Sequence, residues 1–342
     1  MSRPTVNDIA RAAGVSLATV DRVLNQRAGV TEKTVGRVNA AIDALGYVRD
    51  VTAANLARQR RYRMTFVLPE TPVLFVGTLR EAISEAVRGS ATDRTDVRIV
   101  TFPANNPHAL VRSLRSISRA NTDGMAIFAP ETPHVRDAIA RLRADGMPIV
   151  ALVSDLPNTD RDHFVGIDNV AAGRTAGVLM GKFHGRQPGA VMVLVSSMQA
   201  RDNVERRLGF DRVMAESFPR IEVLPSVEGH DDDAVTARVV TAVLDSRPDI
   251  TGIYSIGHGS RPLLDVLRAR VEPGALTVVA HELTRVTREA LASGMFDAVI
   301  SQNVGHIVRS ALRVLRAKSD GLGIVPSQER IRIEIVVKEN LP

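Results

Sequence analysis

Residues 5–50 read TVNDIARAAGVSLATVDRVLNQRAGVTEKTVGRVNAAIDALGYVRD, and this stretch predicts a small helical module. Thr5 can cap a first helix with Asp8 at the third helical position, which is a variant of the capping box. Gly14 is expected to end that helix, because glycine adopts positive φ without a steric penalty. Ser16 then follows as the cap of a second helix.

The second helix is predicted from residue 17 to about residue 24, and a third helix from about 32 to 45. Thr31 caps the third helix and Gly46 stops it. The side chains predicted to face the shared core recur at helical spacing: Ile9, Ala12, Ala13, Val20, Val23, Leu24, Val35, Val38, Ala41, Ile42 and Leu45. Two helices joined by a short turn, with Thr and Arg on the outer face of the second helix, are suited to binding in the DNA major groove.

Charge is distributed unevenly along the 342 residues, whose formal net charge is +6. Residues 1–63 hold 11 basic and 5 acidic side chains, while the rest of the chain holds 33 of each sign. A basic module on a neutral body suggests contact with a polyanion. The alternative is an ordinary helical subdomain without a nucleic-acid partner.

This module resembles the DNA-binding headpiece of the LacI/GalR family of bacterial transcription regulators. The positions that match the family pattern are Asp8, Ile9, Ala10, Ala13, Gly14, Val15, Ser16, Thr19, Val20, Arg22, Val23, Leu24, Asn25, Val30, Thr34, Val38, Ala41, Leu45, Gly46 and Tyr47. Two positions depart from it: Asp21 stands where the family usually has Ser, and Val35 where it usually has Arg. An acid near phosphates is unfavourable, so Asp21 is expected to pair with Arg22 or Arg37.

The resemblance implies which side chains contact DNA. Leu17, Ala18 and Arg22 would face base edges, where Arg can donate two hydrogen bonds to a guanine. Phosphate contacts, which set the register on the duplex, would come from Ser16, Thr19 and Asn25, and the DNA-binding set also includes Thr5 and Thr34. Only one of these base-facing side chains is long and polar, so most of the affinity should come from contacts with the phosphate backbone. DNA binding is therefore expected to fall steeply as the salt concentration rises.

Residues 50–63, DVTAANLARQRRYR, are expected to form a linker after this module. By the resemblance they make a hinge helix that folds when two subunits meet on DNA, and Leu56 wedges between base pairs of the minor groove. The DNA-binding residues assigned here are Ala53, Asn55, Leu56 and Arg58. The alternative is a solvated charged linker.

The body, residues 64–342, alternates short β-rich runs with amphipathic segments, which predicts parallel sheets covered by helices on both faces. Its length favours two lobes. The body resembles the periplasmic-binding-protein type I fold, through the segments FVGIDNVAAGRTAG (164–177), ERRLGF (205–210) and DAVISQN (297–303). The expected organisation is a headpiece (1–49), a linker (50–63), a first lobe (about 64–164 and 293–323) and a second lobe (about 165–292 and 324–342).

Ligands of such folds bind in the crevice beyond the carboxyl ends of the strands. The candidate effector-binding residues follow predicted strands: Phe75, Asp155, Arg201, Asn203, Arg206, His258, Glu282 and Gln302. Carboxylates, amides and Arg together suit hydroxyl-rich ligands, because each hydroxyl donates and accepts. Gly257-His258 replaces an Asn-Asp pair that many family members keep, so the expected effector is a polyol, a cyclitol or an unusual sugar.

Several classes of function are disfavoured. The chain has no Cys, which excludes disulfides and thiolate sites, and no run approaches 18 apolar residues, so no membrane contact is expected. GHDDD (229–233) places its side chains in divergent directions, and Asp232-Asp233 fit better as the start of a helix than as a metal site. No nucleophile accompanies His258 and Asp155, so neither enzymatic activity nor a cofactor is predicted. With no secretory signal, a cytoplasmic location is expected.

The function predicted from the sequence is that of a ligand-responsive regulator, which binds a pseudo-palindromic operator DNA as a homodimer and represses carbohydrate or polyol catabolic genes. One alternative keeps the fold but has activator or co-repressor logic. A rival hypothesis is a sugar-binding protein, or an enzyme, with an accessory DNA module.

Overall fold

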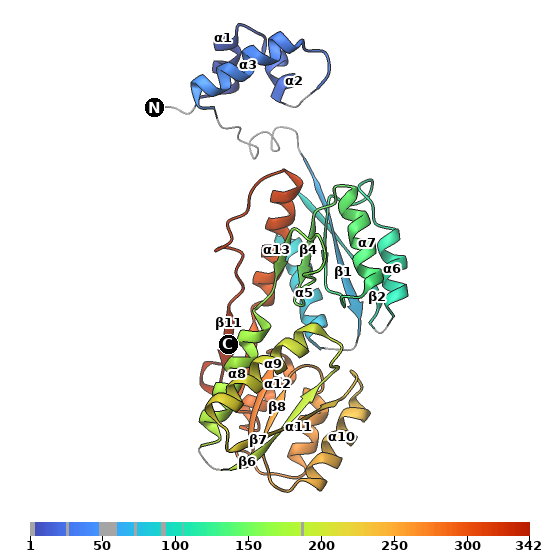
Figure 1. Ribbon diagram of the computed structural model, residues 1–342, viewed down its shortest axis with the longest axis vertical. Helices are drawn as coiled ribbons and strands as arrows, with labels where there is room; N and C mark the ends of the chain where they lie inside the picture. The colour runs from blue at the N-terminus through green and yellow to red at the C-terminus, as the bar shows by residue number, and fades with distance from the viewer. Residues whose placement is uncertain are drawn as a thin grey trace. The chain divides into compact units, whose positions relative to one another are not determined.

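The computed structural model describes residues 4–24, 27–47, 60–71, 74–89, 94–104, 106–185 and 188–342. The chain divides into two compact units, residues 1–60 and residues 61–342 (Figure 1). None of the helices in these described ranges combines the length and the apolar composition needed to cross a membrane.

The first unit consists of three helices, α1 (Val6–Ala13), α2 (Leu17–Leu24) and α3 (Glu32–Leu45). The Thr5 hydroxyl accepts from the backbone N–H of Asp8, and the Asp8 carboxylate accepts from the Thr5 N–H at 2.9 Å, which is a reciprocal capping box. Gly14 and Gly46 end α1 and α3 in the left-handed conformation. Local capping chemistry therefore sets the helix boundaries.

The core of this unit is small. Ile9, Val20 and Val38 are fully buried at its centre, with partly buried Val23, Leu24, Ile42 and Leu45 packed around them. Ala12 was expected in this core but is exposed. The buried face of α1 is formed by Ile9, Ala10 and Ala13, and at about 100° per residue Ala12 points well to one side of it.

The second unit begins with a five-stranded parallel sheet in the order β2-β1-β3-β4-β5. Its strands are β1 (Tyr62–Glu70), β2 (Thr95–Pro103), β3 (Gly124–Ile127), β4 (Ile149–Leu152) and β5 (His163–Val165). The helices that connect them are α5 (Leu74–Gly89), α6 (Pro107–Arg115) and α7 (Pro133–Ala144). Helices α6 and α7 pack together on one face, and α5 packs with α13 on the other (Figure 1). We call this layer the first lobe.

The second lobe is built on a six-stranded sheet in the order β11-β10-β9-β8-β6-β7. Its strands are β6 (Gly189–Val195), β7 (Ile221–Glu228), β8 (Ile250–Ser255), β9 (Thr277–His281), β10 (Ala298–Gln302) and β11 (Ile333–Val336), of which β11 alone is antiparallel to its neighbour. Its helices are α8 (Asn169–Phe183), α9 (Arg201–Ser217), α10 (Asp233–Ser246), α11 (Ser260–Arg268) and α12 (Arg285–Ala292), and a 3-10 turn, η1 (Lys338–Asn340), follows β11.

Strand β7 was not predicted from the sequence. Pro225 interrupts its pattern, and proline cannot donate to a ladder, so it is tolerated in edge strands and bulges. Strand β7 is the edge strand of its sheet, and its pairing with β6 shifts register between Val191 and Val193.

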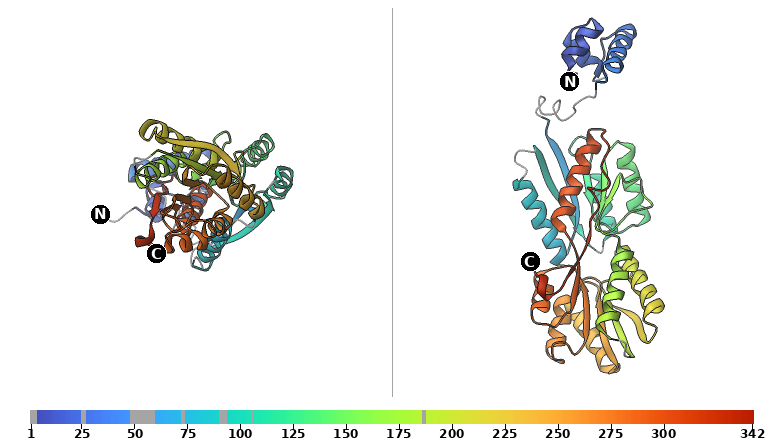
Figure 2. Two further views of the ribbon diagram at one scale, coloured as in Figure 1. Left: turned by 90° about the horizontal axis from the view of Figure 1, so that it is seen from below. Right: turned by 90° about the vertical axis from the view of Figure 1, so that its left-hand side faces the viewer.

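The chain returns to the first lobe later than expected. Residues 293–323 were assigned to the first lobe, but β10 pairs in parallel with β9 in the second sheet and is buried throughout. The crossing occurs at Asn303, which caps α13 (Val304–Ser319) by accepting from the His306 N–H at 2.8 Å. Helix α13 then lies along the first sheet (Figure 2), and the chain returns to the second lobe at β11. The apolar run Ala298–Ile300 is buried because β10 lies inside the second sheet, between β9 and β11.

One apolar cluster continues from the first lobe into the second. It joins Phe66 of β1 and Ile307 of α13 to Val193 of β6 and Phe210 of α9. Separate clusters fill the outer face of each sheet. The lobes are therefore coupled by burial as well as by the crossing chain segments.

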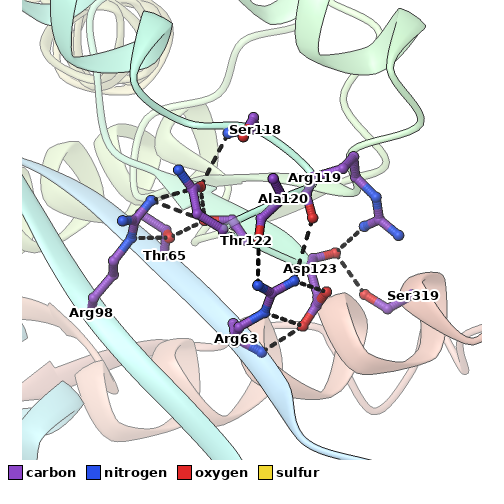
Figure 3. Close-up of polar contacts among 10 residues, drawn as sticks. Arg63, Thr65, Arg98, Ser118, Arg119, Ala120, Thr122, Asp123 and Ser319 are labelled. Atoms are coloured by element: carbon purple, nitrogen blue, oxygen red, sulfur yellow. Dashed lines mark hydrogen bonds and ion pairs between the residues drawn. The ribbon is translucent and has the colours of Figure 1, made fainter.

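The start of β1, directly after the linker, is anchored by polar contacts (Figure 3). Asp123, at the start of β3, accepts from the Arg63 backbone N–H at 2.8 Å and pairs with the Arg63 guanidinium at 3.0 Å. The Asp123 carbonyl in turn accepts from Ser319, the last residue of α13, at 3.0 Å. Beside it, the Tyr62 hydroxyl donates to Asp320 at 2.7 Å. Three elements thus meet where the linker enters the second unit.

Replacing Asp123 with Asn is expected to lower the free energy of unfolding by about 1–2 kcal/mol at neutral pH, because a charge-assisted pair becomes neutral. Burial alone raises the pKa of Asp123, but hydrogen bonds from Arg63 and the Arg63 charge lower it overall, below 3.8. A depressed folded-state pKa stabilises the fold above the unfolded-state value, and this contribution disappears as pH falls through the folded-state pKa. Denaturant titrations from pH 7 downward should show the difference between the proteins shrinking below about pH 4.

Asp96→Asn is the matched control, since Asp96 pairs with Arg61 at 3.7 Å on the exposed surface. Exposed pairs contribute about 0–1 kcal/mol. Equal losses in the two variants would show that the Asp123 anchor adds nothing beyond a surface ion pair.

Candidate nucleic-acid interface and ligand site

Helix α2 presents one face to solvent and the other to the core. Leu17 is 49% exposed, and Ala18 and Arg22 are exposed beside it, while Val20 is buried on the opposite face. An apolar residue left on the surface next to a cation is suited to contact with base edges and a thymine methyl. The structure therefore places the three predicted base readers on one accessible surface.

Asp21 lies on the same face of α2, but its partner is not one of those expected. Its carboxylate pairs with the guanidinium of Arg27 at 3.4 Å, and not with Arg22 or Arg37. Arg27 lies just beyond α2, where the Arg27 N–H donates to the Arg22 carbonyl, so the chain turns back toward Asp21. Each of the two side chains is at least half exposed, and the pair is weak.

The predicted phosphate contacts lie at helix starts. The Ser16 hydroxyl accepts from the Thr19 N–H at 3.2 Å and lies 3.0 Å from the Thr19 hydroxyl. Thr34 has the same arrangement with Thr31 at the start of α3, and Thr5 caps α1. Helix starts carry partial positive charge, which suits phosphate. Five predicted DNA contacts lie outside the described residues: Asn25, Ala53, Asn55, Leu56 and Arg58.

In the second unit, the carboxyl ends of the strands of the two lobes face each other, and a buried guanidinium lies among the strand ends of the second lobe. Arg206, 3% exposed, donates through Nε to the Asn169 side chain at 2.9 Å and through Nη1 to the Ile256 carbonyl at 3.1 Å. Its Nη2 donates to Glu282 Oε1 at 3.1 Å, and that oxygen also accepts from Gln302 Nε2 at 2.8 Å. Three of the predicted effector residues thus form one network.

Two glycines allow Arg206 to reach this position. A Cβ added to Gly173 of α8 would lie 1.9 Å from the Arg206 carbonyl oxygen, and one added to Gly209 of α9 would lie 2.0 Å from the Val170 carbonyl oxygen. The backbones of α8 and α9 therefore approach more closely than any side chain permits. This contact brings Arg206 beside Asn169, which was not among the residues predicted for the site.

The network leaves two buried acceptors without partners. Glu282 Oε2 and Gln302 Oε1 accept no hydrogen bond, although the residues are only 8% and 2% exposed. Glu282 also adopts φ +66°, a conformation that non-glycine residues rarely adopt. Burial raises the pKa of Glu282, whereas Arg206 and Gln302 lower it. Unsatisfied buried acceptors and backbone strain are typical of binding sites.

Two other residues of the second lobe that were predicted to bind the effector, Asn203 and His258, lie outside the Arg206 hydrogen-bond network. Asn203 is buried and donates to the Ser196 hydroxyl and the Ser197 carbonyl, both at 2.9 Å. A Cβ on Gly257 would lie 3.4 Å from the Asn203 amide oxygen, so glycine leaves room beside that amide. Within the described residues, the His258 side chain forms no hydrogen bond with the network; its Nε2 lies 3.1 Å from the Asp233 carboxylate, at the start of α10.

On the first-lobe side, Asp155 is held by a bidentate pair with Arg161. Arg201 crosses between the lobes, pairing with Glu131 of the first lobe at 3.6 Å and with Glu205 of its own helix at 2.7 Å. Phe75 packs into the apolar cluster of the lobes and is 9% exposed.

A second buried pair lies close to the network. The Tyr254 hydroxyl and His281 Nε2 are 2.8 Å apart, and His281 Nδ1 has no partner. Burial lowers the pKa of His281 far below its ordinary value, so the imidazole is neutral. His281 follows its predicted strand beside Glu282 and is a candidate from the sequence, whereas nothing in the local sequence distinguishes Tyr254 or Glu131 from core and surface residues.

Two surface cavities lie away from this network. One of about 490 Å³ lies between α6 and α7, and one of about 530 Å³ lies between α10 and α11. The part of the chain that the structure describes contains no cluster of three or more His, Asp or Glu side chains arranged for a metal ion.

Replacing Arg206 with Ala is expected to cost about 3–5 kcal/mol of unfolding free energy, because it leaves the Glu282 carboxylate buried without its cation. Arg207→Ala is the control on the next residue of α9, since Arg207 pairs with the more exposed Asp211 at 2.7 Å. That change should cost less than Arg206→Ala, because Asp211 is 44% exposed and remains hydrated when its partner is removed. Chemical denaturation measures both, and equal costs would argue against a structural role for the network.

Comparison with known proteins shows which family the chain resembles. The model of the family described as bacterial regulatory proteins, lacI family, matches residues 5–50, and that of the periplasmic binding protein domain matches residues 66–322. The HTH-type transcriptional regulator GntR of Pseudomonas aeruginosa is 26% identical over 333 residues, covering 90% of this chain and 92% of that one. The HTH-type transcriptional regulator DegA of Bacillus subtilis is 28% identical over 176 residues, which is 51% of this chain and 50% of DegA.

Solved structures share the fold of the second unit. A solute-binding protein from Burkholderia graminis, in complex with D-arabinose, has a TM-score of 0.74 at 23% identity and covers 82% of this chain and 96% of its own. GanP, a glucose-galactose binding protein from Geobacillus stearothermophilus, has a TM-score of 0.73 at 18% identity, covering 83% and 99%. Together with the family models, these similarities show that the chain belongs to the LacI family of bacterial transcriptional regulators, in which a helix-turn-helix region precedes a two-lobed periplasmic-binding-protein domain.

Proposed function

We propose that α2 reads operator DNA and that a small molecule bound between the two lobes changes this DNA affinity. The ligand half of the proposal rests on the pair of buried, unpartnered acceptors at Glu282 and Gln302. Such acceptors are costly when left unpaired, and a bound ligand with hydroxyl or amine hydrogens would satisfy them.

Helix α13 offers a path from this site to the linker. It begins two residues after Gln302 and ends at Ser319. The Ser319 hydroxyl donates to the carbonyl of Asp123, the residue that holds Arg63 at the start of β1. Its 16 residues span about 24 Å. A ligand that favours one orientation of the lobes would displace this helix, and with it the start of β1. The effect on DNA binding is limited by how strongly the ligand discriminates the two orientations.

We infer that the ligand is small and hydroxyl-rich and that the protein represses carbohydrate or polyol catabolic genes. One relative is the sucrose operon repressor of Streptococcus mutans, 27% identical over 62% of each chain. The likeness to that repressor favours repression over activator or co-repressor logic, and DNA binding with and without ligand decides the sign. The protein acts as a cytoplasmic sensor and not as an enzyme; recovery of the ligand unchanged would support this.

A homodimer follows from the operator model. Strand β2 is an open edge of the first sheet, nine residues long, and Ile99 is 37% exposed on it. Open edges of this kind readily pair with another chain.

DNA selected from a random library by the full-length protein is expected to contain two inverted half-sites, because a two-fold dimer places two α2 helices on one duplex. Sedimentation analysis should give twice the chain mass of 37.0 kDa. Recovery of a single half-site by a monomeric protein would contradict the dimer.

Arg22→Ala is expected to relax the base preference at one position of each half-site, with a loss of about 1–3 kcal/mol in discrimination. Sequencing of DNA selected by the variant measures this. Arg11→Ala is the control, because Arg11 is an exposed cation on α1 paired with Asp8. It should weaken binding to all sequences to a similar extent, and an unchanged preference in Arg22→Ala would exclude Arg22 as a base reader.

A further inference from the structure

Carboxylates outnumber cations where the two lobes meet. Six acids lie around the Arg206 network or on the loops facing it: Glu131, Asp155, Asp202, Glu205, Asp231 and Glu282. The arginines paired with them are Arg161, Arg201 and Arg206. With all six acids ionised, this set would carry three excess negative charges.

Asp202 is central to this group. Burial raises the pKa of Glu205, Asp231 and Glu282, and the negative charge of Asp202 raises each of these values further. Asp155 of the first lobe adds to the effect on Glu205. Carboxylates from both lobes therefore act on one another across a short distance.

Each arginine of the group is already engaged with acceptors inside it. Arg206 uses all three nitrogens within its network, Arg161 forms a bidentate pair with Asp155, and Arg201 is shared between Glu131 and Glu205. Within the described ranges, neither Asp202 nor Asp231 forms a side-chain hydrogen bond or a carboxylate–arginine pair; the nearest positive influence on Asp231 is that of His258 and His230.

A role in stabilising the fold does not account for all six acids. Asp202 is in the first turn of α9, where the helix dipole favours an acid. This explains Asp202 but supplies no partner for Glu282 Oε2, which is buried, unpartnered and under the influence of Asp202. A neutral hydroxyl would satisfy the hydrogen bond and leave the charge excess in place.

We propose that the effector of this protein carries a protonated amine on a hydroxylated frame, as in an amino sugar, an amino polyol or an aminocyclitol. This inference rests on the proposed ligand site between the lobes. An ammonium group has three donors and a positive charge, so it can donate to Glu282 Oε2 and offset the negative charge of Asp202, while a hydroxyl donates to Gln302 Oε1. Closing such a cation between carboxylates of both lobes stabilises the closed orientation.

Thermal unfolding of the full-length protein tests the proposal with matched compounds. D-glucosamine is compared with D-glucose and N-acetyl-D-glucosamine, and 1-amino-1-deoxy-D-sorbitol with D-sorbitol, at about pH 6.5 where amines are protonated. At least one amine should raise the Tm at a concentration at which its neutral counterparts do not, because ligand binding to the folded state raises Tm.

Asp202→Asn should weaken binding of that amine by about tenfold, and Glu205→Gln is a second variant for the same loss. Asp137→Asn removes an exposed carboxylate on α7 that is not one of the six acids, and it should leave the amine affinity unchanged. Losses of equal size in Asp202→Asn and Asp137→Asn would overturn the role of the acid group.

A neutral compound that raises the Tm as much as its amine would overturn the charge requirement and leave the proposed ligand site standing. If no amine raises the Tm, the amine class is wrong. Binding of each preparation to its selected DNA is measured in parallel, so failure of the amine proposal is separated from failure of the protein as a DNA-binding regulator.

Discussion

A guanidinium that is removed from water must find an acceptor for each of its nitrogens, and this requirement organises the second unit around Arg206. Its three acceptors come from three places in the sequence: Asn169 at the start of α8, Ile256 after β8, and Glu282 after β9. The glycine contacts between α8 and α9 permit that arrangement. The ends of the strands are thereby fixed relative to one another, and the position of Gln302 follows because it shares the Glu282 oxygen.

Gln302 connects the proposed ligand site to the rest of the molecule. Gln302 is the last residue of β10, and α13 begins two residues later. A displacement of Gln302 by a ligand would therefore move the start of a rigid helix. The other end of α13 meets Asp123 and, through it, Arg63 at the start of β1. The apolar cluster shared by the lobes restricts their motion to changes that keep α13 packed against the first sheet.

Local chemistry was readable from the sequence, and long-range pairing was not. The caps at Thr5 and Thr31 and the strands with continuous apolar runs depend on neighbouring residues, and the residues after the strand ends follow from the parallel topology. The pairing of Asp21 with Arg27 depends on how the chain leaves α2, and the place of β10 depends on which sheet offers a partner. Arg201 and Arg206 look equivalent in the sequence, yet five residues on α9 separate an interlobe contact from a buried network.

The two ends of the proposed mechanism use charge in opposite ways. At α2 the Arg22 guanidinium is exposed and stays hydrated until DNA phosphates displace its water. Its contribution to DNA binding is therefore screened by salt. Between the lobes the excess is negative and partly desolvated, so interactions there are stronger and less screened. Polar links between the lobes include the 3.6 Å pair of Arg201 with Glu131 and the 3.4 Å hydrogen bond from the Asn169 amide to the Val153 carbonyl, in addition to the shared apolar cluster. A ligand that adds contacts between these charged side chains in one lobe orientation favours that orientation, which is the condition for a small molecule to control the DNA-binding unit.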